Sequence, residues 1–555
     1  MESVELNDEI QALEASIRSR QTIVRGLEEQ RNDTVAAIFK LPVEIIETIL
    51  EIVQDSPDLV SWMGHVKVPS WTRVTHVCRY WRHVAIGHPR LWTRIATYPE
   101  AWTLIFVERS ANMPINVTLN LTKQRNAPKA LAIILDHCRR TRSLHIEGAH
   151  DDISSALSLM KYPAPILEDL YIFRRWGDDP EIVLPSTLFG GEAPSHLRRL
   201  QLTNLTIDEE SPLISHHLER LVYSPVSTAP NIIRYILHTA TNLRSIELYD
   251  RTLPHTSGDI DTSLDSVNLP RLQSVLLYSN AYLAGRILSN LTVPVLEFMV
   301  LDVCVSPRFP EADQILLPSL GAVMRQSEMA HGPVRGARLT TKRDHGVERA
   351  HLWGWRTPDM RLVNPLGPFQ KEQPCTCISF DIYPNGVFKL SRLHEEIRQL
   401  PLQSLVTLTI RARDLNLPSR WRQVLRPFES IQVLKLDGTF NALFLGLLPS
   451  GDSQGESPPH DDYALPNLVK LIIFRSNINS GGGRLLKPLH GIAAWHLRHG
   501  RRLRISFEQC AKYSQAIDDA LSPIADVSWD NDRFWNGDED ETWLAFMRER
   551  DEDNA

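Results

Sequence analysis

A short motif recurs along most of this 555-residue chain and limits the folds that the chain can adopt. The motif has the form L-x-x-L-x-L, with other large apolar residues in place of some leucines, as in Leu197-x-x-Leu200-x-Leu202. The central residues of the first seven copies, of which the first is partial, are 144, 170, 200, 221, 246, 275 and 299. Three later copies are centred at 408, 434 and 471. The first seven copies follow one another every 21 to 30 residues, which is typical of a repeat architecture.

Each copy predicts one β-strand and a connection that returns to the next strand. Because alternate side chains of a strand point to opposite faces, the leucines of the x-L-x-L centre lie on one side. The stretch between two copies, such as residues 231–241, is long enough for a short helix. The spacing is that of a leucine-rich repeat, so we predict an α/β fold with a leucine-rich-repeat-like solenoid over residues 99–525 and an irregular insertion at about 305–400. The alternative is a set of unrelated βα units that begin alike.

The residues that alternate with the core leucines would line the open face of this sheet. Four outward positions on this face are aromatic, namely Tyr171, Phe173, Tyr249 and Tyr278. Aromatic residues are enriched where proteins bind one another, which makes these four the candidate substrate-binding residues. The alternative is that they only cover a twisted sheet.

The first 37 residues predict one long amphipathic helix. Its apolar residues follow one another in steps of four and three, which is the heptad spacing of a coiled coil. They are Leu6, Ile10, Leu13, Ile17, Val24 and Leu27. Arg20 and Arg31 interrupt this pattern. Two interpretations remain open: a short coiled coil that pairs with a second copy of the chain, or a leader helix that folds back on its own domain.

Residues 38–98 predict a small helical module. A helix begins near Pro42, whose missing N–H costs nothing in the first turn. Its apolar stripe consists of Leu41, Ile45, Ile49 and Val53, widened by Ile46 and Leu50. A second helix is predicted over residues 71–85, and Leu91-Trp92 supplies a final apolar anchor. So small a module has little core of its own, and any apolar residues left exposed would form a partner surface.

Three stretches of this module carry a family resemblance. They are Leu41-Pro42-x-Glu44-Ile45-Ile46-x-x-Ile49, Val77-Cys78-Arg79-x-Trp81-Arg82-x-Val84-Ala85 and Pro89-x-Leu91-Trp92. In this order they resemble the F-box, and the layout of the chain is similar to the F-box proteins of mushroom-forming fungi. The chain departs from the usual pattern in a longer loop between the two helices and in Leu50, where Phe is common.

The resemblance implies an adaptor rather than an enzyme. An F-box would dock on the Skp-type adaptor of a cullin–RING ubiquitin ligase, and the repeat domain would bind a protein substrate. The residues implied in adaptor binding are Leu41, Pro42, Ile45, Ile46, Ile49, Val77, Cys78, Trp81 and Trp92. The alternatives are a scaffold that dimerises through residues 1–37 without any ligase, and an enzyme with an unrecognised site in the 305–400 insertion.

The residues themselves supply no pattern for catalysis or for a cofactor. Cys375-x-Cys377 is the one close cysteine pair, whereas a structural zinc site needs four ligands, usually in two pairs. No nucleophile motif, metalloprotease motif or phosphate loop is present, so we expect no catalytic residue, no metal and no cofactor. Six scattered cysteines favour a reducing, intracellular compartment, cytoplasmic or nuclear. No stretch is apolar enough for a membrane span, and none is basic enough to suggest nucleic acid.

The negative charge of the chain is concentrated at its end. The formal net charge is −7, and residues 526–555 hold 11 acidic and 3 basic residues, so residues 1–525 are close to neutral at +1. Aromatic residues such as Trp535 and Trp543 lie among the acidic ones. This acidic aromatic tail would either cap the last repeat, as solenoids require, or bind a partner.

Overall fold

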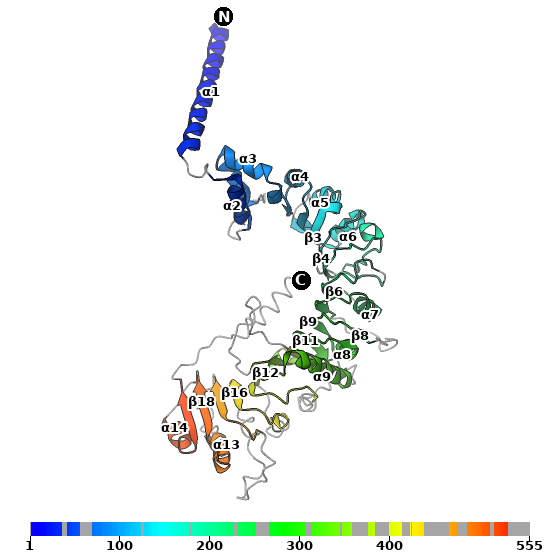
Figure 1. Ribbon diagram of the computed structural model, residues 1–555, viewed down its shortest axis with the longest axis vertical. Helices are drawn as coiled ribbons and strands as arrows, with labels where there is room; N and C mark the ends of the chain where they lie inside the picture. Colours follow the sequence, from blue (N-terminus) through cyan, green and yellow to red (C-terminus); the bar gives the residue numbers. More distant parts are fainter. Residues whose placement is uncertain are drawn as a thin grey trace. The chain divides into compact units, whose positions relative to one another are not determined.

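The computed structural model consists of two compact units, Met1–Ile146 and Glu147–Ala555 (Figure 1). The described residues are 2–35, 41–55, 69–123, 127–177, 179–209, 211–226, 230–250, 266–305, 312–344, 347–357, 376–382, 399–412, 422, 425–437, 465–474, 486–510 and 515–530. Among these residues, no helix is long and apolar enough to cross a membrane.

The first unit consists mainly of helices. Its elements are α1 (Glu2–Val35), α2 (Val43–Asp55), the 3-10 helix η3 (Ser70–His76), α3 (Arg79–Gly87), η4 (Pro89–Trp92), β1 (Arg94–Ile95), α4 (Glu100–Arg109), β2 (Ile115–Asn120), η5 (Leu121–Lys123), α5 (Ala127–Leu135), η6 (Cys138–Arg140) and β3 (Thr141–Gly148), whose last residues belong to the second unit. β1 and β2 pair in parallel. The long helix predicted at the start of the chain corresponds to α1.

The second predicted helix is broken in the structure. Instead of one helix over residues 71–85, the chain forms η3, leaves helical geometry at Cys78, and begins α3 at Arg79. Cys78 is extended (φ −158°, ψ 173°), and its sulfur accepts a hydrogen bond from the backbone N–H of Trp81 at 3.4 Å. The thiol thus serves as the N-cap of α3, a role that apolar periodicity does not reveal.

An aromatic core joins residues 69–98 to the helix that follows them. The buried rings of Trp71, Trp92 and Phe106 meet edge to face, with ring centroids 5.0 to 6.2 Å apart. The indole N–H of Trp92 donates to the backbone carbonyl of Ala85 at 2.8 Å, and the guanidinium of Arg109 lies 4.5 Å from the Trp92 ring centroid. Because α4 supplies Phe106 and Arg109, the small module does not depend on its own core alone.

The second unit alternates strands with helices. Its helices are α6 (His150–Leu159), η7 (Leu188–Gly191), α7 (Pro230–Thr239), α8 (Ala281–Ser289), α9 (Ala312–His331), α13 (Leu486–Arg498) and α14 (Gln515–Leu521). Its strands are β4 (Asp169–Arg174), β5 (Arg199–Thr203), β6 (Arg220–Ser224), β7 (Ser245–Tyr249), β8 (Val267–Asn268), β9 (Ser274–Asn280), β10 (Leu291–Thr292), β11 (Phe298–Val305), β12 (Gly336–Asp344), β13 (Val347–Trp355), β14 (Thr376–Ile382), β15 (Thr407–Ala412), β16 (Val433–Asp437), β17 (Lys470–Phe474), β18 (Leu503–Glu508) and β19 (Ala525–Trp529).

Most of these strands join one sheet. Over the described residues its order is β4-β5-β6-β7-β9-β11-β14-β13-β12-β15-β16-β17-β18-β19, and β13 is the one strand antiparallel to its neighbours. β8 and β10 form a separate parallel pair. In Figure 1, α7, α8 and α9 lie on one side of the strands. The predicted fold class, an α/β repeat-like domain after N-terminal helices and a small helical module, is confirmed.

The register of the sheet follows the motif. Leu170 lies opposite Leu200, which lies opposite Leu221, and the series continues through the central residues of the next copies. These are Ile246, Val275 and Met299, and after the insertion Leu408, Leu434 and Leu471. All nine side chains are buried. The motif spacing therefore predicted which residues align across the strands.

The insertion builds three strands into the sheet. β12 and β13 form an antiparallel hairpin, and β14 then pairs in parallel with β11 and antiparallel with β13. As a result β12, not β11, is the neighbour of β15. On the helical side, α8 and α9 pack closely at Gly285, where an added Cβ would lie 2.9 Å from the Cα of Leu316.

Two further strands follow the last predicted copy. Ile505 of β18 lies opposite Leu471, and Val527 of β19 lies opposite Ile505. The motif misses β18 because Arg502 stands where its first leucine would be. β19 includes residues 526–529, so the first residues of the predicted acidic tail belong to the sheet. Residues 531–555 lie outside the described part of the chain, as does Cys375 of the close cysteine pair.

Candidate functional site

Burial separates the nine candidate adaptor-binding residues into three groups. Ile46 and Trp92 are buried in the core of the module, as is Leu50. Ile45 and Val77 are exposed, at 46% and 63% of their full surface. Pro42 is also exposed, and its carbonyl accepts the first backbone hydrogen bonds of α2. The half-buried remainder consists of Leu41, Ile49, Cys78 and Trp81.

Helix α2 presents an apolar stripe to solvent. Ile45, Ile49 and Ile52 follow one another at i, i+4 and i+7, which places them on one face of the helix. Ile52 is 64% exposed and was not among the predicted residues, although its spacing from Ile45 would have identified it. The adjoining face of the helix buries Ile46 and Leu50. The two residues expected only to widen the stripe are therefore its buried side.

The break at Cys78 determines how the second half of the module is presented. Val77 precedes the cap in a turn, so its side chain projects into solvent instead of continuing a helical face. Trp81 lies one turn into α3 and is half-buried. Its indole nitrogen is buried and makes no hydrogen bond to any described residue. An exposed Val and a partly exposed Trp are apolar surface that another protein can cover.

Polar contacts hold α2 against the segment that follows α3. The two ring nitrogens of His88 lie 2.9 Å from a carboxylate oxygen of Glu51 and 3.3 Å from one of Glu47. The side chain of Gln54 donates to the backbone carbonyl of Leu91 at 2.8 Å. These contacts fix the rotation of α2, and thereby the direction in which its isoleucine stripe points.

The candidate substrate-binding aromatics lie on the side of the sheet opposite the core leucines, here called the strand face. They form two stacked pairs: Tyr171 with Phe173, at 6.4 Å between ring centroids, and Tyr249 with Tyr278, at 4.4 Å. The strands β5 and β6 separate the pairs, so the four residues do not make one continuous stripe. The first row of the strand face contains Tyr171, Gln201, Val222, Glu247, Leu276 and Val300.

A buried carboxylate positions the second pair. Glu247 accepts a hydrogen bond from the hydroxyl of Tyr249 at 3.2 Å and pairs with the guanidinium of Arg220 at 3.0 Å. Leu276, Tyr278 and Val300 then pack into one buried cluster. The apolar cluster on the strand face thus adjoins a buried carboxylate, which is paired with Arg220.

The insertion adds side chains to the strand face that the motif did not predict. Trp353 of β13 packs against the apolar cluster, and the guanidinium of Arg338 lies 5.4 Å from its ring centroid. Beyond them the ammonium of Lys435 lies 3.7 Å from the ring centroid of Phe474 and 3.3 Å from a carboxylate oxygen of Glu508. The motif copy centred at Leu434 places Lys435 on this face, whereas the antiparallel pairing that brings Trp353 and Arg338 there is not indicated by the motif.

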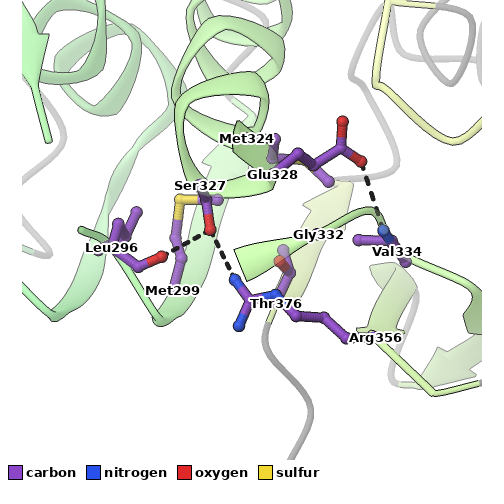
Figure 2. A pocket seen from close by; sticks show the side chains of 9 residues that line it. All are labelled: Leu296, Met299, Met324, Ser327, Glu328, Gly332, Val334, Arg356 and Thr376. Carbon is purple, nitrogen blue, oxygen red and sulfur yellow. Dashed lines mark hydrogen bonds between the residues drawn. The ribbon is translucent and has the colours of Figure 1, made fainter. Parts of the chain in front are cut away.

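A small cavity lies beside the insertion (Figure 2). Its volume is about 10 Å³, close to the space of one water molecule. The hydroxyl of Ser327 donates to the carbonyl of Leu296 at 2.6 Å and accepts from Arg356 at 2.7 Å, and burial raises the pKa of Glu328. The lining residues are Leu296, Met299, Met324, Ser327, Glu328, Gly332, Val334, Arg356 and Thr376. This cavity is too small to hold a substrate.

The described residues contain no group of three or more His, Cys, Asp or Glu side chains placed to hold a metal ion. Burial raises the pKa of the Cys138 thiol to about 11, which keeps that cysteine protonated and unreactive at neutral pH.

Comparison with known proteins identifies one region. Residues 38–98 match the family described as F-box-like, and they form an F-box-like domain. A search of curated proteins found no match. The matched residues begin shortly before α2 and end after β1, so they contain both the isoleucine stripe and the Cys78 cap.

Proposed function

We propose that this chain is a substrate-recognition adaptor of a Skp–cullin–F-box type ubiquitin ligase. The observation that carries the proposal is the F-box-like match, which implies binding to a Skp-type adaptor of a cullin–RING ligase. The exposed apolar side chains of Ile45, Ile52 and Val77 support it. Covering them with a partner would remove apolar surface from water, which stabilises the complex. Catalysis belongs to the partner enzymes, and this chain contributes proximity and orientation inside the cell.

The nine predicted residues take two roles under this proposal. Pro42, Ile45 and Val77 contact the adaptor, together with the exposed parts of Ile49 and Trp81. The remaining residues hold the domain together, and they are Leu41, Ile46, Cys78 and Trp92.

The second unit binds the protein substrate under the same proposal, as a leucine-rich-repeat-like solenoid. Its strand face offers Tyr249 and Trp353, which are partly exposed; Tyr249 stacks on the buried Tyr278 and donates to the carboxylate of Glu247. Rigid aromatic side chains suit protein recognition, because ordering them costs little entropy on binding.

The direct test is co-purification with the Skp-type adaptor. The intact chain should recover the adaptor, and a chain lacking residues 38–98 should not. Leu41→Ala/Pro42→Ala, which alters the entry into α2, should recover less than the intact chain. Equal recovery of the adaptor by all three chains would contradict the proposal that residues 38–98 bind it. Affinity capture with proteomics on the same intact and deleted chains separates ligase partners, which require residues 38–98, from substrates, which do not.

A second candidate function is a scaffold that dimerises through α1 without joining a ligase. The observation that favours it is the exposure of the apolar side chains along α1, such as Leu13 and Leu27. The two candidates make different predictions for one experiment. A dimer that fails to recover any adaptor supports the scaffold, and an adaptor-bound chain supports the ligase subunit.

A further inference from the structure

Helix α1 leaves one continuous apolar face uncovered. Its residues Ile10, Leu13, Ile17, Val24 and Leu27 are each 47% to 60% exposed. We propose that this face pairs with α1 of a second copy of the chain, and that the two helices run antiparallel. The inference rests on the dimer proposed above and adds its orientation, its register and the placement of the two F-box-like domains.

The residue types along this face indicate a two-stranded coiled coil. In heptad positions, the β-branched Ile10, Ile17 and Val24 occupy a, and the leucines Leu13 and Leu27 occupy d. β-branched residues at a with leucine at d favour two strands over three or four. Helix α1 contains 34 residues and is therefore about 50 Å long.

The arginines decide the orientation. In a parallel pair every residue of the seam faces its own copy, so Arg20 would face Arg20 and Arg31 would face Arg31. Two layers of like charge would then lie in the core of a short coiled coil. In an antiparallel pair an a residue faces a d residue, and Arg20 faces Ile17 of the second copy instead.

One antiparallel register satisfies every described layer at once. When Arg20 faces Ile17, Val24 faces Leu13 and Leu27 faces Ile10, and each layer occurs twice by symmetry. This register also overlaps the two helices along their whole length. No apolar seam residue between Ile10 and Leu27 is left without an apolar or long aliphatic partner, since the stem of Arg20 packs while its charge reaches the rim.

The flanking charges agree with the same register. In a parallel pair Glu9 at position g would lie beside Glu14 at position e of the other helix, which is a repulsive contact. In the antiparallel register position e faces position e, so Glu14 lies near Gln21 of the second copy and this repulsion is absent.

This orientation has a consequence for the assembly. The two chains leave the coiled coil at opposite ends, about 50 Å apart, whereas a parallel pair would release them side by side. The F-box-like domain follows directly after α1. An antiparallel dimer would therefore attach its two F-box-like domains far apart.

Two measurements on the full-length chain test the proposal. Sedimentation at increasing concentration reports whether a dimer forms, and a monomer throughout would overturn the dimer itself while leaving adaptor binding untouched. Cysteine crosslinking then reports the orientation, with the unsubstituted chain as the control for its own cysteines. Ile10→Cys alone and Leu27→Cys alone should give no new disulfide dimer, and a mixture of the two should. Efficient crosslinking of either variant alone would mean a parallel pair.

Substitution in the seam tests the placement of Arg20. Arg20→Leu adds an apolar side chain that faces Ile17 in both halves of the dimer, and it should lower the dimer dissociation constant about tenfold or more. Arg25→Leu is the matched control, because it makes the same change at a solvent-facing position and should leave the dissociation constant within about twofold of the parent. Equal effects of the two substitutions would contradict the placement of Arg20 in the seam.

Discussion

Replacing Ile45 and Ile52 by alanine should weaken adaptor binding by the F-box-like domain without unfolding it. The two side chains lie on the solvent side of α2, at 46% and 64% exposure. Full burial of an isoleucine side chain contributes about 1.5–3 kcal/mol, so covering the exposed fractions of both contributes about 1.5–3 kcal/mol together. That corresponds to a loss of about 10- to 150-fold in affinity.

The stability of the domain should change little in this variant. Alanine is a better helix former than isoleucine, and both positions already face water, so the helix itself is not weakened. The matched control is Leu50→Ala in the same helix. Leu50 is buried, and its truncation should cost about 2–5 kcal/mol of folding free energy through the cavity it leaves.

The assay combines calorimetric titration of the adaptor with thermal unfolding of each variant. The expected pattern is opposite in the two variants: Ile45→Ala/Ile52→Ala loses affinity and keeps its melting temperature, and Leu50→Ala melts earlier. Unchanged affinity in the isoleucine variant would refute the reasoning, since the exposed stripe would then lie outside the interface. Parallel losses of affinity and stability in both variants would refute the division between surface and core.

Three further predictions concern the second unit. Gly285→Ala should cost about 1–3 kcal/mol by pushing α9 away from α8, so an unchanged denaturant midpoint would contradict the close packing. Burial lowers the pKa of His496 to about 4, below its unfolded value, so this residue destabilises the fold as pH falls from about 6.5 toward 4. His496→Phe should therefore reduce the stability loss between pH 7 and pH 5 by about 2 kcal/mol in denaturant titrations, and an unaltered pH dependence would disprove it. Tyr249→Ala should remove substrates from affinity capture but keep the ligase adaptor, whereas an unchanged set of captured proteins would place the substrate elsewhere.

Several parts of the structure were predictable because local spacing decides them. A strand buries every second residue, so the recurring leucines specify both the buried face and the residues that align between strands. Leu170, Leu200 and Leu221 are opposite one another for this reason. The same spacing failed at β18, where Arg502 replaces an apolar residue and packing of Ile505 and Phe507 nevertheless continues the sheet.

The sequence predicted which residues belong to the candidate site, but not which of them are exposed and which are buried. The order of residues around Leu41, Cys78 and Trp92 pointed to the F-box-like domain, which the family comparison then matched. Helical periodicity groups Ile45 with Ile46, and only the packing of α2 against its neighbours separates an exposed side chain from a buried one. The contacts of His88 contribute to that rotation, and no local pattern announces them.

By itself the sequence determined the repeating strands, the helical leader and the F-box-like domain, since each depends on side chains a few residues apart. The tertiary structure alone decided which face of α2 is presented to partners and where α3 begins. It alone also brought Trp353 beside Val300, because β13 and β14 enter the sheet between strands distant in the chain. Pairing of this kind depends on which strand edges of the sheet are still unpaired when the inserted strands arrive. A short stretch of sequence does not contain that information.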